Sequence, residues 1–536
     1  MPLPPVPSTA LPGAAVGPLD LERQGDLVRA LQRELGRGGD GPASLLETHI
    51  SYVLVCGERA YKVKKALRTS FLDQSTLARR LHACNEELRL NRRLAPDLYL
   101  GLVPITGPAD QPHLAGPGRA IEWAVMMRAF AQQDLWDARA ARQDLHAAQI
   151  DELLQVLVPF HVAAAVAPPR GRLGSPSQVR APLEDSLVDL VRLLVAPGAA
   201  ASLHRLFEWE LDAGRRLEPV MARRLADGRV RECHGDLHLG NVTTIAGHAT
   251  VFDGIEFNDD FRWIDVASEV AFMAMDLHAH GLPGLAHRFV NGYLEASGDY
   301  DAVQVLDYYL VHRALIRAKV ALLRAQQCGA QPEGADEADR QRDAAGRYLA
   351  LALRFSRLDP APTPPRLLLM HGWSGSGKST AAQRLVESTG AIRIRADVER
   401  KRLAGLQPPD PAAAGPRPDL YSAAMTAATY ERLNQLAVPV LRGGYTAVLD
   451  ATFLRLALRQ AARAVAAAQG VACRILHLEV DADVARQRLR ARAAVGQDPS
   501  DADERVLEAQ IRSAEPLQAD ERDIIEADMP PADVGR

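Results

Sequence analysis

Two fold types are predicted in this chain, an α+β region first and an α/β region with a parallel sheet after it. In the first region, β-like runs at 48–55 and 60–65 flank a short turn, which indicates an antiparallel hairpin, and helical segments follow. In the second region, strand-like and helix-like segments alternate, which is typical of a parallel sheet covered on both faces. The pattern changes at Asp359-Pro-Ala-Pro-Thr-Pro-Pro365, a proline-dense spacer that favours extended conformations.

The length of the chain also predicts two domains. With 536 residues, it exceeds what a single hydrophobic core usually supports. Residues 1–20 are rich in Pro and Ala and lack periodicity, so we expect a flexible tail there. We place an α+β domain at 21–355, a Pro-rich linker at 356–365 and an α/β domain at 366–536.

The individual elements are expected from hydrophobic periodicity and turn residues. The first domain should contain, besides the hairpin, helices at 21–35 and 77–94 and loops at 167–177 and 327–337. The second should contain strands at 367–370, 392–396, 445–449 and 474–480, a helix ending near Glu387, and helices at 456–468 and 484–493.

The composition excludes several classes of protein. A net charge of −4 and a pI near 6.4 argue against a general nucleic-acid or membrane-surface binder. Five scattered cysteines without C-x-x-C spacing fit neither a disulfide framework nor a zinc site. The N-terminus has no cationic start followed by an apolar run, and no stretch is long enough to span a bilayer. We expect a soluble protein of the reducing cytoplasm.

A motif for phosphoryl transfer lies in the run His234-Gly-Asp-Leu-His-Leu-Gly-Asn241. Asp236 can orient an acceptor hydroxyl or take its proton, and Asn241 can ligate Mg²⁺ through its amide oxygen. Asp253, in Thr250-Val-Phe-Asp-Gly254, is expected to be the second metal ligand.

A nucleotide-phosphate contact is expected upstream, at Lys62 in the second hairpin strand. A carboxylate from the following helix should hold this lysine, and Glu87 is preferred over its neighbour Glu86. The chain has 63 Lys and Arg residues together but only six Lys, so each remaining ammonium is a candidate for function. We interpret Lys64, Lys65 and Lys319 as solvated surface residues.

The run 234–241 resembles the catalytic loop of the aminoglycoside phosphotransferase family, which has the bilobal fold of eukaryotic-type protein kinases. The resemblance covers about residues 48–355 and implies that ATP and Mg²⁺ are used. The sequence departs from the kinase pattern because no G-x-G-x-x-G loop precedes the strand lysine.

Other polar residues near this motif are interpreted more conservatively. The acidic patch Glu256, Asp259 and Asp260 could receive a cationic substrate, but a solvated loop is the favoured interpretation. His234 is expected to brace the loop by hydrogen bonding, and no role is assigned to His238.

A second phosphate-binding motif begins at Gly372. The run Gly372-Trp-Ser-Gly-Ser-Gly-Lys-Ser379 satisfies G-x-x-x-x-G-K-[ST], follows an apolar strand and opens a helix for which Gly390 is a plausible stop. Backbone N–H groups should wrap the phosphates, Lys378 should reach the β- and γ-phosphates, and Ser379 should bind Mg²⁺. The expected nucleotide-binding residues are Gly372, Ser374, Gly375, Ser376, Gly377, Lys378, Ser379 and Thr380.

Two aspartates at predicted strand ends complete this second site. Asp397 is expected to act on the acceptor hydroxyl, flanked by Arg395, Arg400 and Arg402. Asp450 is expected to hold the metal through water, or else to bind substrate.

An arginine-rich helix follows at 484–493, with arginines at 486, 488, 490 and 492. Arg488 and Arg492 are four residues apart and share a helix face, so we expect them to close over the transferred phosphate as a lid. The neighbouring run 496–500 is interpreted as a mobile turn.

The second domain resembles the small P-loop kinases that include gluconate kinase, chloramphenicol phosphotransferase, zeta-toxin-like kinases and polynucleotide kinases. Together the two resemblances imply a bifunctional ATP-dependent phosphotransferase that acts on hydroxyl groups of small, sugar-like or aminoglycoside-like acceptors. Two alternatives stay open. One half could be a nucleotide-sensing regulatory module, or the P-loop half could phosphorylate nucleic-acid ends or protein.

Overall fold

The computed structural model describes residues 20–37, 41–69, 72–194, 197–329, 334–359, 363–406, 420–495 and 502–522. The predicted tail before Asp20 and the predicted turn at 496–500 therefore lie outside the described residues. The chain forms two compact units, Met1–Asp134 with Val251–Asp259, and Leu135–Thr250 with Asp260–Arg536. The predicted linker at 356–365 thus falls within the second unit.

The first unit is built on a six-stranded antiparallel sheet with the strand order β1-β2-β3-β6-β4-β5. The predicted hairpin is present as β2 and β3, and Gly57 takes a positive φ of 56° in its turn. The elements are α1 (Leu21–Leu35), β1 (Ser44–Glu47), β2 (Ser51–Cys56), β3 (Arg59–Lys64), α2 (Leu77–Asn91), β4 (Tyr99–Thr106), β5 (His113–Leu114), β6 (Glu122–Arg128) and η1 (Gln132–Asp134).

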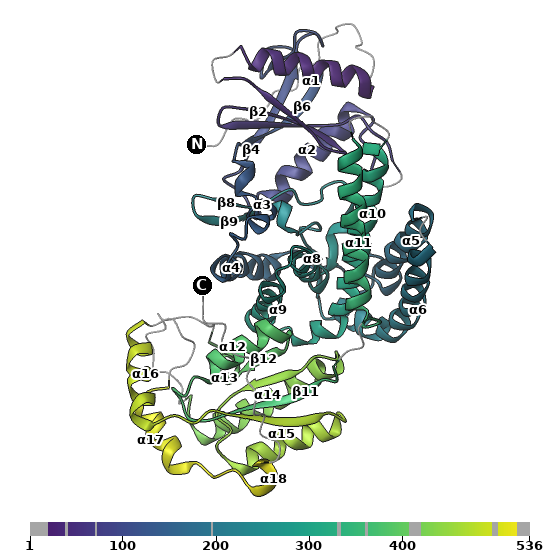
Figure 1. Cartoon of the computed structure of the whole chain (residues 1–536). Helices are drawn as coiled ribbons and strands as arrows, with labels where there is room; N and C mark the ends of the chain where they lie inside the picture. Colours follow the sequence, from purple (N-terminus) through teal and green to yellow (C-terminus); the bar gives the residue numbers. More distant parts are fainter. Residues whose placement is uncertain are drawn as a thin grey trace. The chain divides into compact units, whose positions relative to one another are not determined.

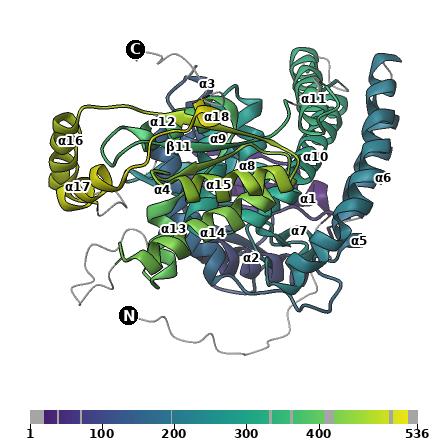
Figure 2. The same ribbon diagram turned by 90° about the horizontal axis from the view of Figure 1, so that it is seen from below.

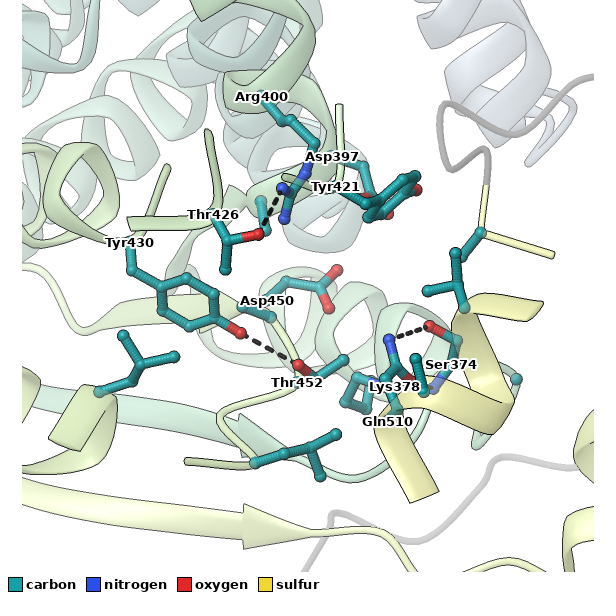
Figure 3. A pocket seen from close by; sticks show the side chains of 18 of the residues that line it. Ser374, Lys378, Asp397, Arg400, Tyr421, Thr426, Tyr430, Asp450, Thr452 and Gln510 are labelled. Carbon is teal, nitrogen blue, oxygen red and sulfur yellow. Dashed lines mark hydrogen bonds between the residues drawn. The ribbon is translucent and has the colours of Figure 1, made fainter. Parts of the chain in front are cut away.

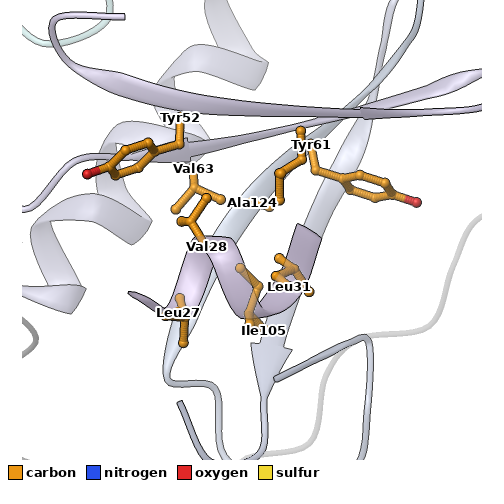
Figure 4. Close-up of a cluster of buried hydrophobic side chains, with 9 residues drawn as sticks. Leu27, Val28, Leu31, Tyr52, Tyr61, Val63, Ile105 and Ala124 are labelled. Carbon is orange, nitrogen blue, oxygen red and sulfur yellow. The ribbon is translucent and has the colours of Figure 1, made fainter. Parts of the chain in front are cut away.

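Helix α1 packs its apolar face on this sheet. Asp20 caps the helix by accepting a hydrogen bond from the Arg23 N–H at 2.9 Å. Leu27, Val28 and Leu31, at helical spacing, are fully buried. Figure 4 shows them against side chains from several strands, namely Tyr52, Tyr61, Val63, Ile105 and Ala124.

The second unit begins with a mostly helical region, as the sequence predicts. Figure 2 shows its long helices α10 and α11 side by side. None of the helices in the described part of the chain has the length and hydropathy needed to cross a membrane. The elements are α3 (Trp136–Ala141), α4 (Ala147–Ala163), α5 (Pro176–Leu193), α6 (Pro197–Ala226), β7 (Val230–Glu232), η2 (Leu239–Asn241), β8 (Val242–Ile245), β9 (His248–Val251), α7 (Asp259–Arg262), β10 (Trp263–Asp265), α8 (Val266–Ala279), α9 (Pro283–Ser297), η3 (Tyr300–Ala302), α10 (Val303–Gly329) and α11 (Ala335–Phe355).

The second unit ends in a four-stranded parallel sheet with the order β12-β13-β11-β14, which confirms the predicted α/β architecture. Helix α12 packs on one face, while α14 and α15 contact each other on the opposite face (Figure 1). The elements are β11 (Arg366–His371), α12 (Lys378–Thr389), β12 (Ile392–Arg395), α13 (Ala396–Leu403), α14 (Ala423–Arg442), β13 (Ala447–Asp450), α15 (Leu456–Ala468), β14 (Ala472–His477), α16 (Ala482–Val495), α17 (Glu504–Ser513) and α18 (Ala519–Arg522).

Candidate functional site

The phosphate-binding loop between β11 and α12 depends on glycine at two close approaches. Gly372 has a φ of 142°, and a Cβ there would lie 2.4 Å from the Leu478 carbonyl oxygen. Gly375 has a φ of 83°, and its Cβ would lie 2.7 Å from the Ala485 carbonyl oxygen. Any side chain at either position would therefore clash with backbone, in addition to the strain of a positive φ.

Lys378 is the first residue of α12, and its ammonium folds back over the loop. The Nζ atom donates to the Trp373 carbonyl oxygen at 2.5 Å and to Ser376 Oγ at 3.4 Å. The side chain is buried, with 8% of the residue exposed. Its charge is thus held at the helix N-terminus, where anions are favoured.

A cavity of about 700 Å³ opens beside the loop. It gathers most residues that the sequence predicts for the second site: Ser374, Gly375, Gly377, Lys378, Ser379, Thr380, Asp397, Asp450 and Arg488. Figure 3 shows how Lys378, Asp397 and Asp450 lie in this cavity. Gly372 and Ser376 shape the loop without lining the cavity, and the Arg492 side chain lies outside the described part of the structure.

Asp450 ends β13, the strand beside β11 in the sheet. Its residue is only 6% exposed, and its Oδ2 atom is buried without a hydrogen-bond partner among the described residues. Buried carboxylate oxygens normally have a hydrogen-bond or metal partner, so this atom is suited to bind a ligand. Because oxygen ligands suit Mg²⁺ and Ser379, which carries a hydroxyl, lines the same cavity, the residues present fit this ion.

The predicted acceptor aspartate, Asp397, lies in the first turn of α13 and lines the cavity. Arg400, one turn later, also lines it, with its guanidinium 4.9 Å from the centre of the Tyr421 ring. Arg395 lines the cavity as well, whereas Arg402 does not and donates to the Glu295 carbonyl oxygen at 2.6 Å. Two of the three predicted flanking arginines therefore face the site.

The arginines of the helix predicted at 484–493 likewise differ in whether they face the site. Arg488 lines the cavity and donates to the Gly375 carbonyl oxygen at 3.3 Å. Arg486 instead pairs with Glu508 at 2.7 Å, and Arg490 also pairs with α17. Among the arginine side chains of α16 that the structure describes, Arg488 is thus the one that faces the phosphate-binding loop.

Gln510 of α17 is a site residue that sequence reasoning missed. Its Oε1 accepts from the Ser374 N–H at 2.9 Å, and its Nε2 donates to Ser374 Oγ at 3.0 Å (Figure 3). No spacing rule connects two residues 136 positions apart, so the sequence carried no signal for this contact.

The first unit brings together three residues predicted for the other phosphoryl-transfer site. Lys62 Nζ lies 2.8 Å from Glu87 Oε1 and also forms an ion pair with Asp253. Glu86, the alternative partner, pairs instead with Arg89 on the same helix. The geometry thus matches the preference for Glu87.

The charges in this cluster stabilise one another. Burial favours the neutral amine, but Asp253 and Glu87 raise the pKa of Lys62 well above its ordinary value. Burial would likewise raise the pKa of Glu87, yet Lys62 and Lys64 lower it. Asp253 has a positive φ of 63°, and its N–H donates to the Tyr99 hydroxyl at 3.1 Å. A side-chain network therefore holds an otherwise unfavourable backbone conformation.

The interpretation of Lys64 and Lys65 as surface residues is wrong. Lys64 is fully buried and lies 2.6 Å from both Glu87 and Glu256, while Lys65 is 7% exposed and pairs with Glu47. Glu256 is also buried, so the solvated-loop interpretation is wrong for this residue. Side chains two positions apart share one face of a strand, so Lys62 and Lys64 lie on the same face of β3. This spacing is visible in the sequence and could have predicted that Lys64 is buried beside Lys62. Lys319 is partly exposed and pairs with Asp189.

The remaining acidic residues of that patch differ from Glu256. Asp259 is exposed, as the solvated-loop interpretation expects. Asp260 forms a bidentate pair with Arg172, with both distances 2.6 Å.

The Asp236 loop belongs to the second unit and is held by hydrogen bonds. Asn241 Nδ2 donates to the Asp236 carbonyl oxygen at 2.9 Å and to its Oδ2 at 3.0 Å, so the amide oxygen of Asn241 is directed elsewhere. Glu269 of α8 accepts from the N–H groups of His234, at 3.0 Å, and Gly235, at 2.6 Å. The Asp236 N–H lies 3.3 Å from His234 Nδ1, consistent with a bracing role for His234.

The electrostatic environment keeps Asp236 ionised. Burial would raise its pKa, but the nearby His238, Arg317 and His234 lower it below the ordinary value. His238 Nε2 lies 3.4 Å from Asp236 Oδ2. His238, to which the sequence assigned no role, therefore contacts the predicted base. Burial also opposes ionisation of Glu269, yet hydrogen bonding from His161 helps to lower its pKa to about 2.

Comparison with known proteins supports the P-loop assignment. Residues 367–517 match the family model AAA_33, described as an AAA domain. Over 457 residues, the chain is 31% identical to uncharacterised proteins of Mycobacterium tuberculosis and Mycobacterium bovis, covering 84% of this chain and 86% of each relative. The chain belongs to their family. Its C-terminal region is a P-loop domain of the AAA_33 type, as the motif predicts.

Solved structures of three kinases show weaker similarity to this chain. A choline/ethanolamine kinase family protein from Mesorhizobium loti has a TM-score of 0.37 and 12% identity, covering 62% of this chain and 99% of that chain. A putative aminoglycoside phosphotransferase from Ralstonia eutropha has a TM-score of 0.34 and 14% identity, covering 62% and 98%. The APS kinase of Mycobacterium tuberculosis has a TM-score of 0.20 and 24% identity, covering 26% and 78%.

Proposed function

We propose that the chain is a bifunctional ATP-dependent phosphotransferase whose two halves each transfer a γ-phosphate to a hydroxyl group of a small polyhydroxy acceptor. The observation that carries the proposal is the single cavity that holds Lys378, Ser379, Asp397, Asp450 and Arg488. A P-loop alone would fit any nucleotide hydrolase. Asp397, in the first turn of α13 and in the same cavity, adds what a transferase needs, a group that orients the acceptor hydroxyl.

In the P-loop half, each residue has a separate task. Loop N–H groups and Lys378 bind the β- and γ-phosphates, and Arg488 stabilises charge on the transferred group. Asp397 orients the acceptor hydroxyl and takes its proton. Ser379 and Asp450 would hold Mg²⁺, which neutralises phosphate charge when it is bound.

In the other half, Lys62, held by Glu87, is proposed to contact the α- and β-phosphates of ATP. Asp236, kept ionised by its surroundings, orients the acceptor hydroxyl. Asn241, in the Asp236 loop, and Asp253, in the first unit, each carry an oxygen atom of the kind that binds Mg²⁺. These roles follow the catalytic pattern in the sequence.

The test is ATP consumption by wild type, Asp236→Ala and Lys378→Ala against pooled sugars, amino sugars, aminoglycosides, nucleosides and oligonucleotide ends, with mass detection of products. We expect two phosphorylated products, each lost in a different variant. A single product lost in one variant would make the other half a nucleotide sensor instead. Phosphorylated oligonucleotide ends, lost in Lys378→Ala, would replace small acceptors by nucleic acid for the P-loop half.

A further inference from the structure

Helix α9 contacts elements from both proposed phosphotransferases, the one predicted at 21–355 and the one predicted at 366–536. It packs against α4 and α8 in the helical region and against α12, the helix that begins with Lys378 (Figure 1). All these elements belong to the second compact unit. Helix α9 thus contacts α8, which holds the Asp236 loop, and α12, which begins with Lys378.

One face of α9 holds β12, the strand that leads to Asp397. Strand β12 is at the edge of the parallel sheet, and the Arg393 N–H donates to Asn291 Oδ1 of α9 at 2.7 Å. This bond satisfies a backbone group on the edge of the sheet. Glu295, one turn after Asn291, lies 3.3 Å from Arg393 and 3.5 Å from Arg395.

These contacts bear directly on the cavity. Arg395 lines it and precedes Asp397 by two residues. Arg393 is 7% exposed and donates to the Ser379 carbonyl oxygen at 3.2 Å, so it links Glu295 to the start of the P-loop helix. Loss of the Glu295 carboxylate would leave a buried guanidinium without its counter-charge.

The opposite face of α9 supports the Asp236 loop. The hydroxyl of Tyr293 lies 2.8 Å from His161 Nδ1, and His161 Nε2 lies 3.1 Å from Glu269. Glu269 is the carboxylate that accepts from the two N–H groups immediately before Asp236. Residues two positions apart in an α-helix differ by about 200° around its axis, so Tyr293 faces away from Asn291.

We infer that α9 is a shared support in which Asn291 and Glu295 are positioning residues for the acceptor side of the P-loop site and Tyr293 is a positioning residue for the Asp236 loop. The inference rests on the proposed function for what these two segments do. It adds that the P-loop half depends on a helix from the other half of the chain, so the two reactions share one structural element.

The test compares three variants of the full chain by hydrogen–deuterium exchange. Glu295→Gln removes the charge that holds Arg393 and Arg395, and Tyr293→Phe removes the hydroxyl that meets His161. The matched control is Glu387→Gln, because it breaks the 2.7 Å pair between α12 and Arg288 of α9 without touching β12.

We expect Glu295→Gln to speed exchange over 392–403 about tenfold and to leave 234–241 unchanged, and Tyr293→Phe to do the reverse. The control should change neither segment. Equal exchange in Glu295→Gln and the control, or changes over both segments in either variant, would overturn the inference.

A kinetic measurement separates this inference from the proposed function. In Glu295→Gln, the product lost in Lys378→Ala should show a KM for its acceptor raised about tenfold, with a smaller change in kcat and an unchanged Kd for MgAMPPNP. A changed Kd for MgAMPPNP with an unchanged acceptor KM would overturn it. If no phosphorylated product forms at all, the proposed function fails, while the exchange experiment still decides whether α9 holds the two segments.

Discussion

The two lysines proposed to bind nucleotide phosphates are held in opposite ways. Lys62 pairs with carboxylates 25 and 191 residues away in the sequence, so its position depends on segments that only folding brings together. Lys378 donates to oxygen atoms five and two residues away within its own loop. The first lysine is thus held by charged side chains from distant segments, whereas the second donates to oxygen atoms of its own loop.

This difference determines how each site can fail. A buried charge network loses stability when one member is removed, because its partners stay charged and desolvated. A glycine-rich loop tolerates the loss of its lysine but not the addition of a Cβ where backbone approaches closely. The predictions below test this contrast.

The largest expected effect is on transfer rates. Asp236→Asn and Asp397→Asn should each slow one reaction about 10²–10⁴-fold, because each removes a proton acceptor without removing a phosphate contact. The measurement is product formation by mass detection, with MgAMPPNP affinity as the control. Loss of both products in either variant, or loss of nucleotide binding, would contradict separate sites.

The next effect concerns stability. Lys62→Met should lower the free energy of unfolding by about 2–3 kcal/mol, because Glu87 and Asp253 each lose one charged hydrogen-bond partner while Glu87 keeps Lys64. Lys378→Met should cost about 1 kcal/mol through the lost hydrogen bonds to its own loop. Denaturant unfolding of the full-length variants checks this, and equal losses would remove the contrast between the two sites.

A pH effect is expected from buried histidines in both halves. Burial lowers the pKa of His312 to about 3 and that of His371 to about 4. The unfolded chain binds a proton near pH 6.5 and the folded chain does not, so stability should fall as the pH is lowered from about 6.5 towards 4, by roughly 1.4 kcal/mol per unit for each histidine. Thermal unfolding of wild type and His312→Phe between pH 7.5 and 5 measures this, and identical slopes would count against it.

The smallest effect tests the backbone geometry of the P-loop. Gly375→Ala places a Cβ 2.7 Å from the Ala485 carbonyl oxygen and should weaken MgAMPPNP binding about tenfold. Gly405→Ala is the matched control, because Gly405 has a φ of 72° but no heavy atom within 4 Å of the added Cβ. Calorimetric titration should show the loss in the first variant only.

Much of the fold was predictable because its signals are local. The helices at 21–35 and 456–468 begin and end where periodicity predicts, and α12 ends before Gly390, whose φ is 75°. The P-loop, Asp397 and Asp450 were predictable for a related reason, since the loop, Asp397 and Asp450 each lie at or just after a strand end, and strand ends in a parallel sheet meet at one edge. Helix 77–94 ends earlier than expected, at Asn91, whose side chain accepts from the Gly254 N–H at 2.7 Å.

Local patterns in the amino-acid order therefore account for the helices, the hairpin, the parallel sheet and the phosphate-binding loop, since backbone geometry and side-chain periodicity act over a few residues. Pairings between distant segments became visible only in the folded chain. Lys64 with Glu256, Ser374 with Gln510, and α9 with β12 join segments separated by about 100 residues or more, and no spacing rule reaches that far. Burial selects these pairs, because a desolvated polar group must find whichever partner the fold brings to it.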